Sequence, residues 1–104
     1  MHKPPEKLRV LKLYSPRCLK CYALKEIYEK LAESRDDIEW YAFNVDMVGD
    51  INVLFPTVNG VPTLCTIAFP GEVKVMVDPE TPHPETWYYE KDILNFIEEQ
   101  INEY

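Results

Sequence analysis

No apolar run in the 104 residues approaches the roughly 20 residues that a membrane-spanning helix needs. The N-terminal residues 1–5 are not followed by an apolar stretch of the signal-peptide kind, so the cytoplasm is the expected compartment. Positive charge is also scarce, because 18 Asp and Glu outnumber 11 Lys and Arg and give a net charge of −7. Nucleic acid and anionic lipid both favour positive surfaces, so neither is expected as a main partner.

Cysteine and histidine are few as well, with three and two copies. Three cysteines are too few, and odd in number, for a secreted disulfide scaffold. Cys18 and Cys21 stand at C-x-x-C spacing, which is typical of a redox pair or of half a metal site. The other half is missing, because Cys65 stands alone and His2 and His83 lie in Pro-flanked segments. We therefore expect neither a metal site within one chain nor an organic cofactor.

The rest of the sequence alternates between strand and helix patterns. The predicted elements are a strand at 8–14, a helix at 18–34, a strand at 38–45, a short helix within 47–57, a strand from the turn at 58–64 through Phe69, a strand at 73–77, an irregular loop at 78–89 and a helix at 90–103. Pro70 and Gly71 predict a hairpin turn. The order β-α-β-α-β-β-α predicts a single α/β domain over 1–104, with a mixed central sheet flanked by helices on both faces.

Cys18 is expected at the first turn of the helix over 18–34. Unpaired N–H groups and the positive end of the helix dipole favour a thiolate there. Arg17 and Lys20 add positive charge, and each lowers the pKa of Cys18 from the free value of about 8.5. Since the thiolate is the attacking species in disulfide exchange, we predict that Cys18 is the nucleophile and that Cys21, one turn deeper, is the resolving thiol.

At these residues the chain resembles the thioredoxin superfamily. The matching segments are VLKLYSPRCLKC at 10–21, Asn44-Val45-Asp46, and VNGVPTL at 58–64. The last segment is similar to the family's cis-proline loop. A single C-x-x-C is a weak signal, but a strand, a C-x-x-C, a helix and a Gly-Val-Pro-Thr at this distance together are a strong one. The resemblance covers most of residues 8–104 and implies a thioredoxin-like fold.

The resemblance also implies a function. It predicts a thiol–disulfide oxidoreductase that acts on disulfide-containing proteins and receives electrons from a thioredoxin reductase-type enzyme or from glutathione. It implies a cis peptide bond between Val61 and Pro62, with the Val61 backbone pairing with an extended substrate and Pro62 shaping the groove. Thr63 continues this groove loop.

The sequence departs from the family's pattern near the cysteines. Arg17 stands where typical thioredoxins have tryptophan, and Leu19-Lys20 replace Gly-Pro between the cysteines. Many thioredoxins carry a buried aspartate six residues before the first cysteine, where this chain has Lys12. A lysine close to the sulfurs stabilises thiolate directly, whereas a lysine on the solvated side of the strand does not, and both placements are open from the sequence.

The loop at 78–89 is several residues longer than the family's short turn. We expect it to form one wall of the substrate surface, with Trp87 in the groove. The alternative is that Trp87, Tyr88 and Tyr89 pack the last helix onto the sheet. Cys65 is expected as a buried core thiol, because free cysteine behaves as a small hydrophobic residue.

Two other functions stay open at this point. The chain could be a redox-silent thioredoxin-fold module that binds a protein in its groove without turnover. It could also be a metal-binding dimer, in which four thiolates from two chains hold zinc or an iron–sulfur cluster.

Overall fold

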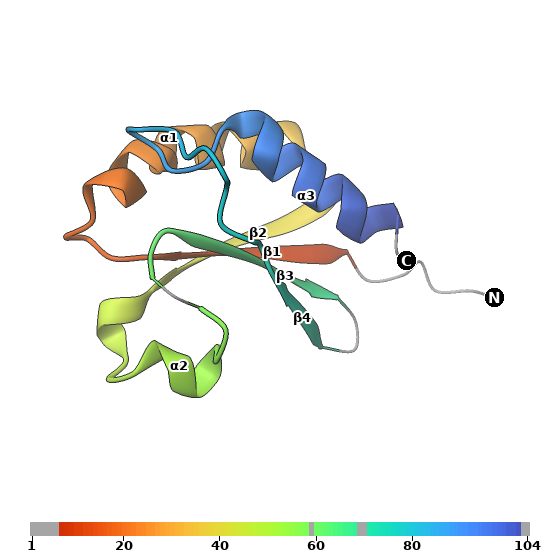
Figure 1. Ribbon diagram of the computed structural model, residues 1–104. Helices are drawn as coiled ribbons and strands as arrows, with labels where there is room; N and C mark the ends of the chain where they lie inside the picture. The colour runs from red at the N-terminus through yellow and green to blue at the C-terminus, as the bar shows by residue number, and fades with distance from the viewer. Residues whose placement is uncertain (1–6, 59, 69–70, 103–104) are drawn as a thin grey trace.

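The computed structural model describes residues 7–58, 60–68 and 71–102. Its four strands form one mixed sheet in the order β2-β1-β3-β4 (Figure 1). In chain order the elements are β1 (Leu8–Tyr14), α1 (Leu19–Ser34), β2 (Ile38–Asn44), the 3-10 helix η1 (Val45–Met47), α2 (Ile51–Leu54), β3 (Thr63–Ala68), β4 (Glu72–Val75) and α3 (Glu90–Asn102). β1 runs parallel to β2 and antiparallel to β3, and β4 is antiparallel to β3.

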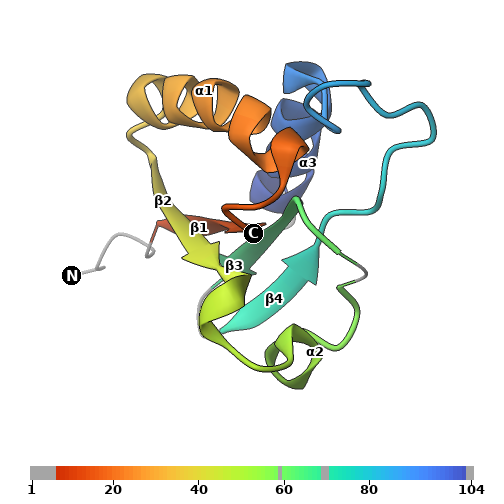
Figure 2. The same cartoon turned by 90° about the vertical axis from the view of Figure 1, so that its left-hand side faces the viewer.

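The helices lie on both faces of this sheet. Figures 1 and 2 show α1 and α3 together on one face and the short α2 on the other. The predicted α/β architecture, a mixed central sheet flanked by helices, is therefore confirmed. No helix in residues 7–58, 60–68 and 71–102 is long and apolar enough to cross a membrane.

The predicted boundaries differ from the observed ones by a few residues. The second strand ends at Asn44, because the Asn44 side chain accepts the backbone N–H of Asp46 over 2.9 Å and caps the 3-10 helix. In the hairpin between β3 and β4, Gly71 has a φ of +143°, which side-chain-bearing residues rarely adopt. The predicted positions at Phe69, Pro70 and 103 lie outside the described residues, as does Asn59 of the loop at 58–64.

The main core lies between the sheet and the helices α1 and α3. Side chains alternate along β1, so Val10 and Lys12 face α1 while Leu11 and Leu13 face the opposite side. The buried residues of this core are Leu8, Val10, Leu24, Tyr28, Leu31, Ile38, Leu64, Met76, Tyr88, Ile93 and Ile97. The alternation places Lys12 among apolar side chains beneath α1.

A smaller core lies on the α2 side of the sheet. Leu13, Val58 and Cys65 are buried there, and Ile51 and Phe55 pack against them. Cys65 has no exposed surface, which confirms the expected core thiol.

Candidate functional site

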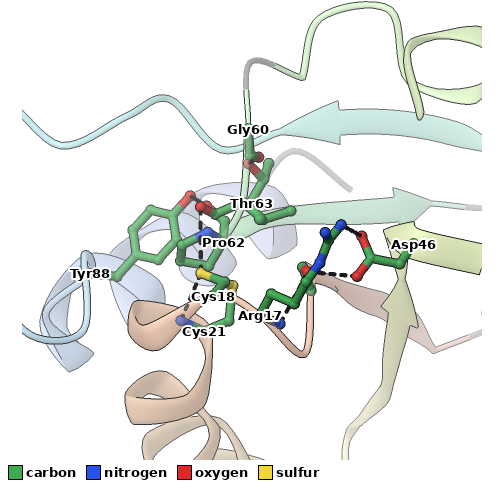
Figure 3. Close-up of a disulfide and its surroundings, with 10 residues drawn as sticks. Arg17, Cys18, Cys21, Asp46, Gly60, Pro62, Thr63 and Tyr88 are labelled. Atoms are coloured by element: carbon green, nitrogen blue, oxygen red, sulfur yellow. Dashed lines mark hydrogen bonds and ion pairs between the residues drawn. A yellow bond between two sulfur atoms is a disulfide. The ribbon is translucent and has the colours of Figure 1, made fainter. Parts of the chain in front are cut away.

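The two cysteines of the C-x-x-C motif lie at the N-terminus of α1. Cys18 is the N-cap residue, and its Sγ accepts the backbone N–H of Cys21 over 3.1 Å. The two cysteines are joined by a disulfide, with their Cα atoms 5.2 Å apart (Figure 3). Cys18 is partly exposed whereas Cys21 is 3% exposed. An approaching molecule therefore meets the sulfur of Cys18 first, and Cys21 lies behind it.

The loop before β3 lies against the sulfur of Cys18. The peptide bond between Val61 and Pro62 is cis, as the resemblance implies. The carbonyl oxygen of Val61 is 3.8 Å from Cys18 Sγ. The buried hydroxyl of Thr63 donates to the carbonyl oxygen of Gly60, within the same loop (Figure 3). Thr63 thus braces the loop from inside, and Val61 is the residue that presents backbone beside the sulfur.

Arg17 is turned away from the sulfurs and toward Asp46 (Figure 3). Its guanidinium is 3.2 Å from one Asp46 carboxylate oxygen, and the hydroxyl of Ser15 donates to the other oxygen over 2.8 Å. The Arg17 and Ser15 hydrogen bonds hold the pKa of the Asp46 carboxyl below its usual range. These contacts tie the turn before Cys18 to the end of β2, and the charge of Arg17 is largely matched by Asp46.

Lys20 reaches the loop between β4 and α3. Its Nζ lies 5.0 Å from the centre of the Trp87 ring, within cation–π range. Trp87 has a φ of +69°, a left-handed conformation that is uncommon for a bulky residue. It holds this conformation inside a short bridge, in which His83 and Trp87 exchange backbone hydrogen bonds of 3.1 and 3.0 Å. The loop is thereby anchored beside the C-x-x-C motif.

The aromatic residues that end this loop divide between the two roles expected of them. Tyr88 is fully buried in the main core, and its hydroxyl donates to the carbonyl oxygen of Pro62 over 3.4 Å. Tyr89 is 40% exposed and its ring packs edge-on against His83. Trp87 is half-buried and contacts the core from the side of the motif. Tyr88 packs the helix onto the sheet, while Trp87 and Tyr89 reach the surface.

Lys12 lies beneath α1, with 5% of its surface exposed. Its Nζ is 4.7 Å from the centre of the Tyr28 ring and 5.5 Å from that of Tyr14. Burial lowers the pKa of this lysine, the charge of Glu29 opposes that effect, and the charge of Lys25 adds to it. Lys12 and Cys21 line the same cavity. The sequence left open whether Lys12 lies close to the sulfurs or on the solvated side of its strand, and the solvated placement is wrong.

Sequence reasoning missed the supporting residues of this site. Ser15 and Asp46 follow the adjacent parallel strands β1 and β2, whose carboxyl ends meet at one edge of the sheet. That topology is the signal from which their contact could have been predicted. No pattern in the sequence indicates the hydrogen bond from the hydroxyl of Tyr88 to the carbonyl oxygen of Pro62. Among the described residues, no group of three or more His, Cys, Asp or Glu is placed to hold a metal ion.

Comparisons with known proteins show what this arrangement resembles. Neither the protein-family models nor the curated proteins match this sequence. Solved structures do match. A mutant thioredoxin from Halobacterium salinarum is 25% identical, with a TM-score of 0.69 over 89% of this chain and 74% of that one.

Two further thioredoxins match with lower identity. The thioredoxin of Fasciola hepatica is 18% identical, with a TM-score of 0.69 over 89% of this chain and 80% of its own. Oxidised mitochondrial thioredoxin 3 from Saccharomyces cerevisiae is 17% identical, with a TM-score of 0.68 over 89% of this chain and 78% of its own. These likenesses confirm the resemblance drawn from the sequence: the chain has a thioredoxin-like fold with a Cys18–Cys21 pair at the start of its first long helix.

Proposed function

We propose that this chain is a thiol–disulfide oxidoreductase in which Cys18 is the nucleophile and Cys21 the resolving thiol. The observation that carries the proposal is the cap of α1, where the accessible sulfur of Cys18 accepts the N–H of Cys21 over 3.1 Å. That hydrogen bond and the helix dipole both stabilise negative charge on this sulfur. The thioredoxin-like fold supports the proposal.

In the proposed reaction the thiolate of Cys18 attacks one sulfur of a protein disulfide. The substrate's S–S bond breaks, its other sulfur leaves as a thiolate, and a mixed disulfide forms on Cys18. Cys21 loses its proton and attacks Cys18 Sγ, which releases the second substrate thiolate. The substrate is reduced by two electrons, and the Cys18–Cys21 pair is oxidised to the disulfide that the structure contains.

Several residues are proposed to assist this exchange. Val61 offers backbone to an extended substrate, Pro62 and Thr63 fix that loop, and Trp87 forms the opposite wall. Lys12, when protonated, stabilises the thiolate of Cys21 from the cavity behind it. Arg17 and Lys20 tune Cys18 only weakly, since Asp46 and Trp87 engage their charges.

The oxidised pair must be reduced for turnover. A thioredoxin reductase-type enzyme or glutathione would supply two electrons in a reducing compartment such as the cytoplasm. The reduction potential of the pair distinguishes these donors. A value near about −270 mV favours the reductase, whereas a value near about −200 mV favours glutathione.

The experiment is insulin reduction by the purified protein with dithiothreitol as the electron source. We expect turnover by the native chain and none by Cys18→Ser. Cys21→Ser should accumulate a mixed disulfide on Cys18, which mass spectrometry detects and which Cys18→Ser cannot form. Cys65→Ala is the matched control, and it should retain turnover because Cys65 is buried away from the site.

The same samples separate the alternatives. A native chain that binds insulin or another protein but reduces no disulfide supports the redox-silent binding module. Zinc or iron in protein purified under reducing conditions, together with a dimeric mass, supports the metal-binding dimer.

A further inference from the structure

A cavity of about 450 Å³ lies between α1 and the strands β1 and β2, and Cys21 is one of the residues that line it. Lys12 lies on its floor, and its aromatic lining comprises Tyr14, Tyr22, Tyr28, Trp40 and Tyr41. Small-molecule sites commonly measure about 300–1,000 Å³ and combine mostly apolar walls with a few polar groups. This cavity has that size and that composition.

The ammonium group of Lys12 has no direct partner in this cavity, although the charge of Glu29, which also lines the cavity, acts on it. Within the described part of the chain, Lys12 forms no ion pair and donates no hydrogen bond to another side chain or to the backbone. Its contacts are with the faces of Tyr14 and Tyr28. The ammonium is thus held by aromatic faces and by whatever enters the cavity, and aromatic faces compensate for the desolvation of a charge only partly. Lys12 is 5% exposed, and its remaining surface faces the cavity that it lines.

Two charged residues stand at the rim. Lys25 and Glu29 line the same cavity and lie 3.9 Å apart, with side chains that are 61% and 63% exposed. The opposite charges of Lys25 and Glu29 cancel each other, so the net charge of the cavity is the positive charge of Lys12. An occupant that lowers the free energy of this site must carry negative charge at its inner end.

We propose that this cavity is a binding site for a small organic carboxylate with a flat, apolar body. The carboxylate pairs with the ammonium of Lys12, and the body lies against the cavity wall that Tyr28 and Trp40 form, whose rings pack edge to face with centres 5.3 Å apart. An inorganic anion could pair with Lys12, but it would leave the aromatic walls of the cavity uncovered. The proposal concerns binding, and it stands whether or not the cysteines turn over.

The test is a titration of the oxidised protein with phenylacetate, followed by amide and indole resonances in ¹H–¹⁵N NMR spectra. The indole N–H of Trp40, which donates to the carbonyl oxygen of Arg35 over 2.9 Å, reports on the cavity wall. We expect saturable shifts at Cys21, Ala32 and Trp40. Phenylacetamide, which has the same body without the charge, and acetate, which has the charge without the body, should each bind at least about tenfold more weakly.

Three variants locate the site. Lys12→Met, which keeps the apolar stem, should weaken phenylacetate binding about tenfold or more, while Lys30→Met, an exposed lysine of α1 outside the cavity, should leave it unchanged. Glu29→Gln removes a repulsive charge from the rim and should tighten binding about twofold. Dispersed spectra of each variant show that it is folded.

Two results overturn the proposal. One is the absence of saturable shifts with phenylacetate up to about 10 mM in the native chain. The other is equal binding of phenylacetate and phenylacetamide, or of phenylacetate to native protein and Lys12→Met. The comparison of the two probes on native protein needs no variant, so it decides the question even if Lys12→Met does not fold.

Discussion

The hydroxyl of Tyr88 donates a hydrogen bond to the carbonyl oxygen of Pro62 over 3.4 Å. The ring of Tyr88 is fully buried in the main core, so this contact couples the packing of the core to the loop that faces Cys18. Burial raises the pKa of Tyr88 to about 12, and the phenol therefore remains a neutral donor through the physiological range. This donor is one of the contacts that hold the cis-proline loop, together with the hydroxyl of Thr63.

Tyr88→Phe should remove the donor without changing the packing of the ring. We expect the free energy of unfolding to fall by about 1 kcal/mol, because the Pro62 carbonyl keeps its burial and loses its partner. Urea denaturation followed by circular dichroism measures the change. Tyr22→Phe is the matched control, since Tyr22 is 79% exposed and its change should stay within about 0.5 kcal/mol. Equal stabilities of the two variants would show that Tyr88 acts through its ring alone.

Asp46→Asn should release Arg17 from its counter-charge. The freed guanidinium then adds to the positive potential at the start of α1, so we expect the pKa of the Cys18 thiol to fall by a fraction of a unit. The ultraviolet absorbance of the thiolate during a pH titration of reduced protein measures it. A rise in that pKa would show that the negative charge of Asp46 does not offset Arg17.

The same contact predicts a pH dependence of stability. The pKa of Asp46 is lowered in the folded chain by Arg17 and Ser15. Its contribution is therefore present above the ordinary carboxyl value of about 4 and is lost as the pH falls through the lowered value. The native chain and Asp46→Asn should differ in stability at pH 6, and the difference should vanish as the pH falls below the lowered pKa of Asp46. A difference that persists in acid would contradict this origin.

Cys65 should be unreactive in the folded protein. It is fully buried, and burial raises its pKa to about 11, so the thiolate is scarce at neutral pH. Reduced native protein should react with Ellman's reagent at Cys18 and Cys21, and at Cys65 only after denaturation. The pKa of Cys65 is raised in the folded chain only. The contribution of this thiol to stability is therefore complete below about pH 8.5 and declines as the pH rises toward about 11. Fast labelling of Cys65 in folded Cys18→Ser would contradict this placement.

Much of this fold was predictable because its patterns are local. β1 and α1 match their predicted ranges closely, since each carries a continuous apolar run or stripe. The Cys18–Cys21 disulfide was predictable too, because a three-residue separation at a helix start fixes both sulfurs without distant contacts. α2 was harder to delimit, because its four residues are largely exposed and carry little periodicity.

The surroundings of the pair were less predictable for a physical reason. The direction of a long charged side chain depends on which partner tertiary structure brings within reach. Arg17 turns to Asp46 because β1 and β2 end side by side, and Lys20 lies over Trp87, which the bridge to His83 holds beside the motif. Burial of Lys12 also depends on packing. Side chains alternate along β1, and Lys12 lies on the face that α1 covers.

Lys12→Met should stabilise the protein at neutral pH. Burial lowers the pKa of Lys12, so the folded chain binds fewer protons there than the unfolded chain does. Stability supplied by this group is therefore present above the ordinary lysine value of about 10.4 and is lost as the pH falls through the lowered value. We expect a gain of about 1 kcal/mol at pH 7, as often follows replacement of buried ions by apolar residues.

The gain should shrink as the pH approaches 10, which separates the effect of charge from that of packing. Denaturant unfolding at several pH values measures it, and Lys30→Met, at an exposed position of α1, is the control. A gain that is constant with pH would assign the effect to the methionine side chain rather than to the missing charge.

His83→Ala should loosen the loop that carries Trp87. Nδ1 of His83 accepts the backbone N–H groups of Glu85 and Thr86 over 3.0 and 3.2 Å, and this holds the bridge to Trp87 closed. Without that acceptor Trp87 should leave Lys20, and one wall of the proposed substrate surface is lost. We expect kcat/KM to fall about threefold for insulin and to stay unchanged for hydroxyethyl disulfide, which is too small to reach the loop.

His83→Asn is the matched variant, because an asparagine oxygen accepts backbone N–H groups two residues along the chain in the same kind of turn. It should restore most of the activity with insulin. An equal loss with both disulfides would place the effect of the loop on the cysteines themselves. If neither rate changed in His83→Ala, Trp87 would be a packing residue and the substrate surface would end at Val61 and Pro62.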